Sequence, residues 1–268
     1  MTLLKRYIKN LLLNVLPDGL LLTIKKIYYT RSLISFNEAD VHVIKLLITS
    51  GDCVIDIGAN IGWYTKILSE LVGSKGRVFS IEPIPSTFNL LAYFVNKFKL
   101  NNVHLSNFSI SDKDGEVLME IPMYESGGKN YYQAKIVKEN QNNNNFMDKF
   151  IIQAKSLDSF FSRSPNKIDF IKCDVEGHEL SVVRGAVKLI AKSKPAWLIE
   201  INSNPDLEGT DSFILFNIMK KYGYKAFYFD GNKLEERLKN NTSINYFFLG
   251  QNHIHIIENA GLIVHSLN

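Results

Sequence analysis

The distribution of apolar and polar residues divides this chain into short apolar runs and longer segments in which apolar residues recur every three or four positions. The runs predict strands and the longer segments predict helices. The predicted strands are 53–57, 77–81, 103–108, 168–173, 196–201, 224–229 and 245–249, and the predicted helices are 38–49, 61–71, 86–99, 180–192 and 212–222. Strands that alternate with helices indicate an α/β fold: a doubly wound parallel sheet with helices on both faces and an antiparallel edge strand.

One region, at about 109–166, departs from this alternation and predicts an insertion. Residues 116–122 alternate apolar and polar side chains after a turn at Asp114-Gly115, which predicts an antiparallel strand with 150–154 as its partner. Between the two strands, two adjacent glycines and an asparagine run at 141–145 predict a long loop. Long loops are often lids, although a neutral insertion explains the asparagine run almost as well. Tyr131-Tyr132 is the better candidate for contact with a substrate.

The two ends of the chain predict segments outside the main domain, which spans 51–250. Residues 1–50 predict helices, and lysine, arginine and asparagine interrupt the leucines of 3–22 too often for a membrane span. We favour a helix that packs on the core; the alternative is a basic amphipathic helix resting on the inner membrane surface. Residues 251–268 predict a C-terminal tail.

Composition narrows the class of protein without naming its chemistry. The 268 residues are 46% hydrophobic and 22% charged, as in a soluble globular protein, and the net charge of +4 gives no support to nucleic acid as a partner. Cys53 and Cys173 lie in or beside predicted buried strands. They indicate small core residues in a reducing compartment, and therefore a cytoplasmic protein.

The segment 54–65 (V-I-D-I-G-A-N-I-G-W-Y-T) predicts a cofactor site, because a buried strand enters a glycine turn and then a helix. No Gly-Lys-Ser/Thr follows, which excludes a P-loop, and a dinucleotide site would carry a third glycine. Asp56, at the end of the strand, repels pyrophosphate but attracts a cationic amino-acid end. Glu82 ends the next strand, where an acid accepts both hydroxyls of a ribose. S-adenosylmethionine has both features, and we therefore expect it as the cofactor.

A second group of candidate residues follows the later strands. Asp174 and Glu200 end the strands at 168–173 and 196–201, so both side chains should face the same crevice. Three roles remain open for the acids: a general base or orienting group, a pair that holds a divalent cation, or caps of the following helix. Glu176 and His178 are further candidates for the catalytic role. Lys172, if buried, needs an acidic partner, most naturally a nearby acid such as Glu200.

Four segments resemble the FkbM-type methyltransferases, in the expected order. They are 51–65 (G-D-C-V-I-D-I-G-A-N-I-G-W-Y-T), 81–85 (I-E-P-I-P), 111–116 (S-D-K-D-G-E) and 168–179 (I-D-F-I-K-C-D-V-E-G-H-E). The resemblance spans roughly 50–202 and implies a Rossmann-like class I methyltransferase sheet. It also implies methylation of hydroxyl oxygens on sugars, polyketides and other small or glycan-like acceptors. The family often carries a histidine soon after the fifth-strand acid, but none follows Glu200 here.

These arguments assign two sets of residues. The expected cofactor-binding residues are Asp56, Gly58, Ala59, Asn60, Gly62, Tyr64, Thr65, Glu82, Pro83, Ile84, Ser109 and Ile110, the last two by the resemblance. The expected catalytic residues are Asp174, Glu176, His178 and Glu200, with Asp174 and Glu200 as the metal candidates.

We therefore expect an S-adenosylmethionine-dependent O-methyltransferase that acts on a hydroxyl of a sugar, glycan or related small molecule. The alternatives are N- or C-methylation on the same scaffold, a non-catalytic cofactor-binding module, and an oxidoreductase. The missing third glycine disfavours the oxidoreductase.

Overall fold

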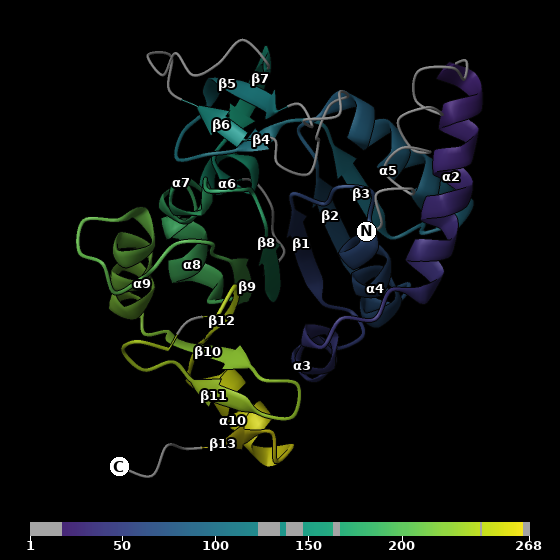
Figure 1. Cartoon of the computed structure of the whole chain (residues 1–268). Helices are drawn as coiled ribbons and strands as arrows, with labels where there is room; N and C mark the ends of the chain where they lie inside the picture. The colour runs from purple at the N-terminus through teal and green to yellow at the C-terminus, as the bar shows by residue number, and fades with distance from the viewer. Residues whose placement is uncertain (1–17, 123–134, 138–146, 163–166, 242, 265–268) are drawn as a thin grey trace, which may run out of the picture.

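The computed structural model describes residues 18–122, 135–137, 147–162, 167–241 and 243–264. Within them the chain forms one nine-stranded sheet, in the order β13-β11-β10-β12-β9-β8-β1-β2-β3, and one four-stranded sheet, in the order β4-β7-β5-β6 (Figure 1). The strands of the larger sheet are β1 (Cys53–Ile57), β2 (Arg77–Ile81), β3 (Val103–Ser106), β8 (Phe170–Cys173), β9 (Ala196–Glu200), β10 (Lys225–Phe229), β11 (Leu234–Glu236), β12 (Asn245–Leu249) and β13 (Ile263–Val264). Those of the smaller sheet are β4 (Ser109–Ile110), β5 (Gly115–Pro122), β6 (Lys135–Val137) and β7 (Met147–Lys155).

Helices cover both faces of the larger sheet. They are α2 (Asp18–Ser35), α3 (Asp40–Leu47), α4 (Trp63–Val72), α5 (Pro85–Lys97), α6 (Leu157–Phe160), α7 (Glu179–Arg184), α8 (Val187–Ser193), α9 (Asp211–Lys221) and α10 (Gln251–Asn259). Successive side chains of a strand point to opposite faces: Val54 packs in the core with α3, α4 and α10, whereas Ile55 packs in the core with α7, α8 and α9. Both cores are apolar, which explains why β1 is an unbroken apolar run apart from Asp56.

The parallel strands are doubly wound, as the sequence predicts. From β1 the chain passes to β2 and β3 on one side, and later to β8 and β9 on the other, always in parallel pairs. The direction of winding therefore reverses between β1 and β8. In such sheets ligands bind beyond the carboxyl ends of the strands at this position.

The far side of the sheet differs from the prediction. The reversed strand β12 lies between β9 and β10 and is antiparallel to both, whereas β11 and β13 form the edge. Residues 224–229 and 245–249, which the Gly231-Asn232 turn between them predicts to pair as a hairpin, do pair antiparallel as β10 and β12. The turn itself, however, connects β10 to β11, and there the Asp230 carboxylate accepts backbone hydrogen bonds from Asn232 and Lys233. The reason is burial: residues 246–249 are all buried and apolar, so β12 needs a partner on both sides.

The predicted C-terminal tail is wrong for residues 251–264, which form α10 and β13. Ile254 and Ile257 are buried three positions apart on one face of α10 and pack in the core that also contains α3. Many polar residues around these two isoleucines hide the helical pattern in the sequence.

The insertion forms the smaller sheet. β5 and β7 pair antiparallel, as predicted, and β6 adds a strand within the region predicted as loop. Met119, Ile121 and Ile152 from this sheet form an apolar cluster with Ile84, which follows β2. This cluster attaches the insertion near the carboxyl ends of the parallel strands. Tyr131-Tyr132 and the asparagine run lie outside the described residues.

Helix α2 lies against the domain along part of its length. Leu33 is buried with Ile61 and Phe94, and the Trp63 indole Nε1 donates a hydrogen bond to Ser32 Oγ at 3.0 Å. Several apolar side chains of α2 are nevertheless exposed, among them Leu22, Ile27 and Tyr28. No helix in the described part of the chain is long and apolar enough to cross a membrane. Contact with a membrane surface stays a prediction, and residues 1–17 lie outside the described part.

Candidate active site

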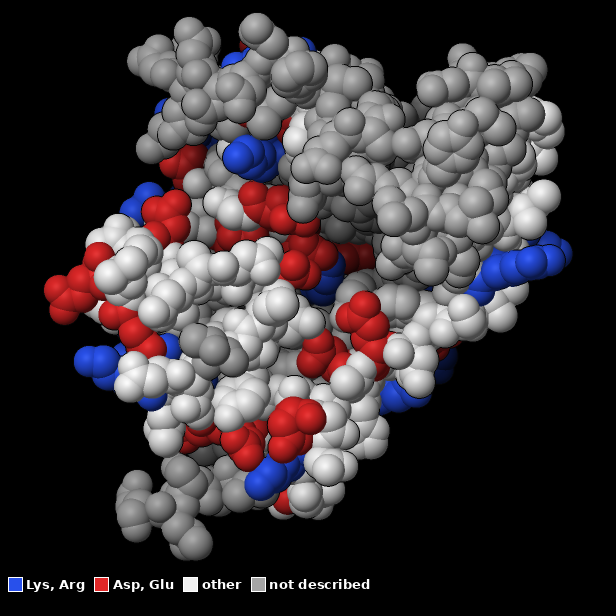
Figure 2. All heavy atoms as spheres, in the orientation of Figure 1, with Lys and Arg blue, Asp and Glu red and all other residues white. Residues whose placement is uncertain are grey.

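A cavity of about 250 Å³ lies where the parallel strands end, between the main domain and the smaller sheet. Its wall contains residues from the ends of β1, β2, β8 and β9, and Met119 and Ile136 from the smaller sheet. Acidic side chains gather near the middle of the face seen in Figure 2, around a basic one. The cavity therefore occupies the position that the sheet topology assigns to a ligand.

Asp56 is the next-to-last residue of β1, lies in the cavity wall and is completely buried. Its Oδ2 accepts a hydrogen bond from Thr65 Oγ1 at 2.6 Å, whereas its Oδ1 has no hydrogen-bond partner among the described residues. Burial raises the pKa of this carboxyl above its usual range, although nearby Lys172 opposes the shift. Thr65 does not line the cavity; it orients Asp56 from behind. An unpaired buried oxygen is costly unless a ligand satisfies it.

Contacts with neighbouring segments account for the glycines in the turn after β1. Gly58 has φ 74°, and a Cβ there would lie 1.8 Å from the carbonyl oxygen of Asp174, so no other residue fits. The backbone N–H groups of Gly58 and Ala59 both donate to the carbonyl of Ile81. Gly62 lies outside the cavity wall, and a Cβ there would be 2.8 Å from Leu91. Gly62 thus permits packing on α5.

Glu82 follows β2 and is 4% exposed. Its Oε2 accepts a hydrogen bond from the backbone N–H of Asn60, and its Oε1 accepts one from Ile84, both at 2.9 Å. Burial raises its pKa to about 7 even though these two bonds favour the ionised form. Asn60 holds a left-handed conformation at φ 51° within the turn that carries this N–H group. The remaining predicted cofactor residues in the wall are Ala59, Tyr64, Pro83, Ser109 and Ile110.

Asp174, just after β8, is paired with a lysine of the same strand. Lys172 Nζ lies 2.8 Å from Asp174 Oδ2 and 4.9 Å from the centre of the Tyr64 ring. Lys172 is only 6% exposed. Burial alone would lower its pKa, but the carboxylates of Asp174 and Asp56 raise it above the usual value, and the lysine stays charged. Lys172 is thus buried and paired with a nearby acid, as predicted, but this acid is Asp174; Glu200, the example named, contributes more weakly.

Glu176 and Glu200 lie in the same wall as Asp174. Burial, then repulsion by Asp174 and Glu200, raises the pKa of Glu176 to about 7. Burial and Asp174 likewise raise the pKa of Glu200. Glu176 adopts φ 50° and forms no hydrogen bond or ion pair among the described residues. Three of the predicted catalytic residues are thus brought together.

His178 is placed apart from that group. It is not part of the cavity wall, and its Nε2 lies 3.0 Å from Ser111 Oγ. Burial lowers the pKa of this imidazole. Glu179 is also turned away and accepts a hydrogen bond from the backbone N–H of Gly177, as expected for an acid at the first turn of a helix. The catalytic role of His178 stays a prediction without support from its position.

Several residues of the wall have no signal in the sequence. Phe36 and Glu38 lie before α3, and Trp63 begins α4. Glu38 accepts a hydrogen bond from the Tyr64 hydroxyl at 2.8 Å. Asn245 enters the wall because β12 pairs antiparallel with β9, which brings it opposite Glu200. Sheet topology brings Asn245 to the wall, whereas Phe36 and Glu38 reach it through the packing of the segment before α3.

Asp174 and Glu200 are the two candidate metal ligands. Among the described residues, no group of three or more His, Cys, Asp and Glu side chains is arranged to hold a metal ion. Asp174 already has an ammonium as its partner, and Glu200 accepts a weak hydrogen bond from Asn202 at 3.3 Å. A metal role for the pair stays a prediction.

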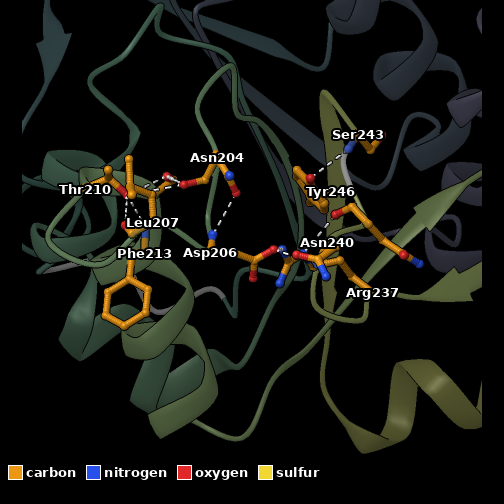
Figure 3. A network of polar contacts seen from close by, with 11 residues as sticks. Asn204, Asp206, Leu207, Thr210, Phe213, Arg237, Asn240, Ser243 and Tyr246 are labelled. Carbon is orange, nitrogen blue, oxygen red and sulfur yellow. Dashed lines mark hydrogen bonds and ion pairs between the residues drawn. The ribbon is translucent and has the colours of Figure 1, made fainter.

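A polar network lies beside the end of β9 and the start of β12 (Figure 3). Arg237 donates from Nη2 to Asp206 Oδ2 at 2.5 Å and from Nε to the carbonyl of Asn241. Asp206 Oδ2 also accepts the backbone N–H of Asn240 at 2.8 Å. The loop after β9 is thereby fixed to the segment that leads into β12. Thr210 ends that loop by capping α9, because its Oγ1 accepts the N–H of Phe213.

Replacing Arg237 with Gln should change binding in one part of the cavity alone. The variant loses the Arg237 contacts to Asp206 and Asn241, which frees the loop after β9. We therefore expect the KM for a ligand bound at the ends of β8 and β9 to rise by about tenfold, because a small displacement of the residues that position a ligand has an effect of this size. Affinity for a cofactor held by the β1 and β2 ends should stay within about twofold. Titration and steady-state kinetics measure both. Lys225→Gln, which breaks the exposed pair with Glu236, is the matched control and should change neither.

Comparisons with known proteins agree on the type of chemistry. A family profile for the methyltransferase FkbM domain matches residues 56–226. The chain is 28% identical over 167 residues to the hexuronic acid methyltransferase AglP of Haloferax volcanii, which covers 61% of this chain and 63% of that protein. It is 24% identical over 143 residues to methyltransferase 1 of Beauveria bassiana, covering 49% and 57%. The chain thus spans less than two thirds of the length of either relative.

Solved structures give a weaker likeness. The methyltransferase FkbM of Methylobacillus flagellatus is 17% identical to the matched part, with a TM-score of 0.48, over 75% of this chain and 44% of that one.

Proposed function

Because this chain belongs to the FkbM methyltransferase family, whose methyl donor is S-adenosylmethionine, we propose that it methylates a hydroxyl oxygen of a sugar, glycan or related small molecule. The transfer of a methyl group follows from the family; the oxygen and the sugar-like acceptor are the proposal. The printed name of the Haloferax relative, a hexuronic acid methyltransferase, supports an acceptor of the sugar type.

The cavity suits S-adenosylmethionine as the donor. The buried Oδ1 of Asp56 needs a donor, which the ammonium of the cofactor would supply. The carboxylate of Glu82 would accept the ribose hydroxyls, while Ile84 and Ile110 offer an apolar wall for the adenine. When bound, the cofactor supplies a methyl group on a positively charged sulfur.

The observation that carries the proposal is the position of Asp174. Its carboxylate lies in the wall of the same cavity as Asp56 and is held by Lys172. An alcohol is a poor nucleophile until its proton is removed, and a carboxylate within reach of the acceptor hydroxyl would orient it and take that proton. Lys172 fixes the orientation of this carboxylate, and the smaller sheet would exclude water from above.

The proposal is tested first by binding and then by turnover. Isothermal titration should show binding of S-adenosylhomocysteine and none of NAD; binding of NAD alone would overturn the assignment. A panel of sugars, sugar nucleotides and glycan fragments is then incubated with labelled methyl donor. The labelled product should carry an O-methyl group, and labelling of nitrogen or carbon would replace the oxygen assignment.

Affinity for the cofactor should depend on pH through Glu82. Its pKa of about 7 means that it is largely protonated at pH 6, whereas two donating hydroxyls favour the carboxylate, so binding must release a proton. Affinity should therefore rise with pH by at most about tenfold per unit below 7 and level off above it. Titrations with S-adenosylhomocysteine at pH 6, 7 and 8 measure the slope. The Glu82→Gln variant should bind S-adenosylhomocysteine more weakly, and its affinity should change little with pH. If the affinity of this variant depends on pH as in the wild type, another group releases the proton.

A further inference from the structure

Three polar side chains meet in the apolar core behind the glycine turn. On one face of the sheet, β1 buries Val54 and then Asp56, β2 buries Val78 and then Ser80, and the register pairs Asp56 directly with Ser80. Thr65 lies on the buried face of α4, which packs on both strands. Asp56, Thr65 and Ser80 are all completely buried. The core is therefore polar at one point, where an apolar residue would continue the pattern of each strand.

Hydrogen bonds connect these side chains in a defined direction. Thr65 Oγ1 lies 2.6 Å from Asp56 Oδ2 and 2.9 Å from Ser80 Oγ. A hydroxyl has one proton, and Thr65 donates its proton to the carboxylate, so the Ser80 hydroxyl must donate to Thr65. The chain runs from Ser80 through Thr65 to Asp56, and hydrogen bonds in such a chain strengthen one another. It satisfies Oδ2 of Asp56 and leaves Oδ1 without a partner among the described residues.

Of these three residues, only Asp56 belongs to the cavity wall. Apolar residues at the three positions would avoid the cost of burying polar groups, so stability alone does not explain the chain. Control of the carboxylate does explain it. A carboxylate that is held through one oxygen has a fixed orientation and presents the other oxygen to a ligand, which is how supporting residues preorganise a binding site.

We propose that Thr65 and Ser80 are positioning residues for the methyl donor: through Asp56 they set the affinity for its amino-acid end without contacting it. This inference rests on the proposed function, in which the ammonium of the donor binds Asp56. It changes the role of Thr65 from the predicted direct contact to an indirect one, and it adds Ser80, which has no signal in the sequence. The nucleoside end, which is assigned to Glu82 and the apolar wall, should not depend on either hydroxyl.

Two ligands separate the ends of the donor. S-adenosylhomocysteine has the amino-acid end, whereas methylthioadenosine has the same nucleoside and thioether with a methyl group in its place. Thr65→Val keeps the shape of the side chain and removes the hydroxyl. By isothermal titration it should bind S-adenosylhomocysteine about tenfold more weakly than the wild type does, and methylthioadenosine within about twofold. Thr65→Ser, which keeps the hydroxyl, should restore the wild-type affinity.

The outcomes distinguish the inference from the proposed function. Equal weakening of both ligands in Thr65→Val, or no weakening of either, would overturn the inference, because a general disturbance of the fold affects both ends of the donor alike. Failure of the wild type to bind S-adenosylhomocysteine would instead overturn the proposed function.

Ser80→Ala tests whether the two hydroxyls act in sequence. Thr65 still donates to Asp56 in this variant, so the affinity for S-adenosylhomocysteine should fall by only about threefold. In the Thr65→Val background, Ser80→Ala should cause no further loss, because its effect passes through Thr65. Losses that add in the double variant would contradict the chain. If Thr65→Val does not fold, Ser80→Ala decides alone: a threefold loss confined to S-adenosylhomocysteine supports the inference, and no loss overturns it.

Ser69→Ala is the matched control. Ser69 is a second buried hydroxyl of α4, one turn after Thr65, and its Oγ donates a hydrogen bond to Asn102 and not to Asp56. Neither Ser69 nor Asn102 belongs to the cavity wall. The variant should keep both affinities within about twofold, even where its free energy of unfolding falls, because its site is independent of the chain. A selective loss of S-adenosylhomocysteine in this control would overturn the assignment to Thr65 and Ser80.

Discussion

Turnover of the Asp174→Asn variant is expected to fall by about 10²- to 10⁴-fold, which is the contribution of a positioned general base. The amide keeps the shape of the side chain and an oxygen for Lys172 Nζ, which lies 2.8 Å from the carboxylate in the wild type. It cannot, however, take a proton from the acceptor. Single-turnover measurement with labelled donor and the best acceptor of the panel gives the chemical step directly.

Binding measurements separate this loss from a loss of structure. The affinity of Asp174→Asn for S-adenosylhomocysteine should stay within about threefold, because Asp56 and Glu82 are unchanged. Asp211→Asn, an exposed acid at the start of α9, should keep full activity. Turnover equal to that of the wild type would show that the proton leaves through another group, and Glu176 would then be tested in the same way.

Lys172→Met is expected to lower the free energy of unfolding by about 3 kcal/mol at neutral pH, the usual result of removing one partner from a buried ion pair. Lys172 is 6% exposed and faces the fully buried carboxyl of Asp56 as well as Asp174. Methionine fills the space but leaves both carboxyls without a counter-charge. Denaturation in urea at fixed pH measures the change, and Lys75→Met, at an exposed lysine, should change stability by less than about 0.5 kcal/mol.

The way in which the stability loss of Lys172→Met depends on pH provides a second test of the role of charge. Burial raises the pKa of Asp56, and Lys172 opposes that shift. Without the lysine this folded-state pKa rises further above the value of the unfolded chain, which is about 3.9. Such a group contributes stability at low pH that is lost as the pH rises. The deficit of Lys172→Met should therefore be smaller at pH 5 than at pH 8. A deficit independent of pH would mean that packing, not charge, explains the effect.

The sequence predicts the parts of the fold that have a local pattern. β1 and β2 begin and end where the apolar runs predict, because each is buried on both faces and ends in an acid or a turn. The same local signals identify Asp56, Glu82 and Asp174. The crossover rule also restricts the order of the parallel strands β9-β8-β1-β2-β3, but it does not place β10 to β13, where the structure differs from the prediction.

What the sequence does not predict depends on distant contacts. Phe36 and Glu38 reach the cavity only because α3 packs beside the sheet, and β6 forms only because β5 offers it an edge. Gly62 shows a different limit. The backbone at Gly62 has φ near 100°, which favours glycine. The sequence alone does not show whether a ligand or the nearby Leu91 side chain excludes a larger residue there.

The contact between Gly58 and Asp174 has a mechanical consequence. The carbonyl of Asp174 occupies the space where a side chain of residue 58 would lie, so the turn that we propose to hold the donor is in direct contact with the residue that we propose to face the acceptor. A change in the backbone of that turn would therefore displace Asp174 as well. Under the proposed function, directed evolution toward a larger donor would have to move the glycine turn and Asp174 together, whereas the walls formed by the smaller sheet and by Phe36 could change independently.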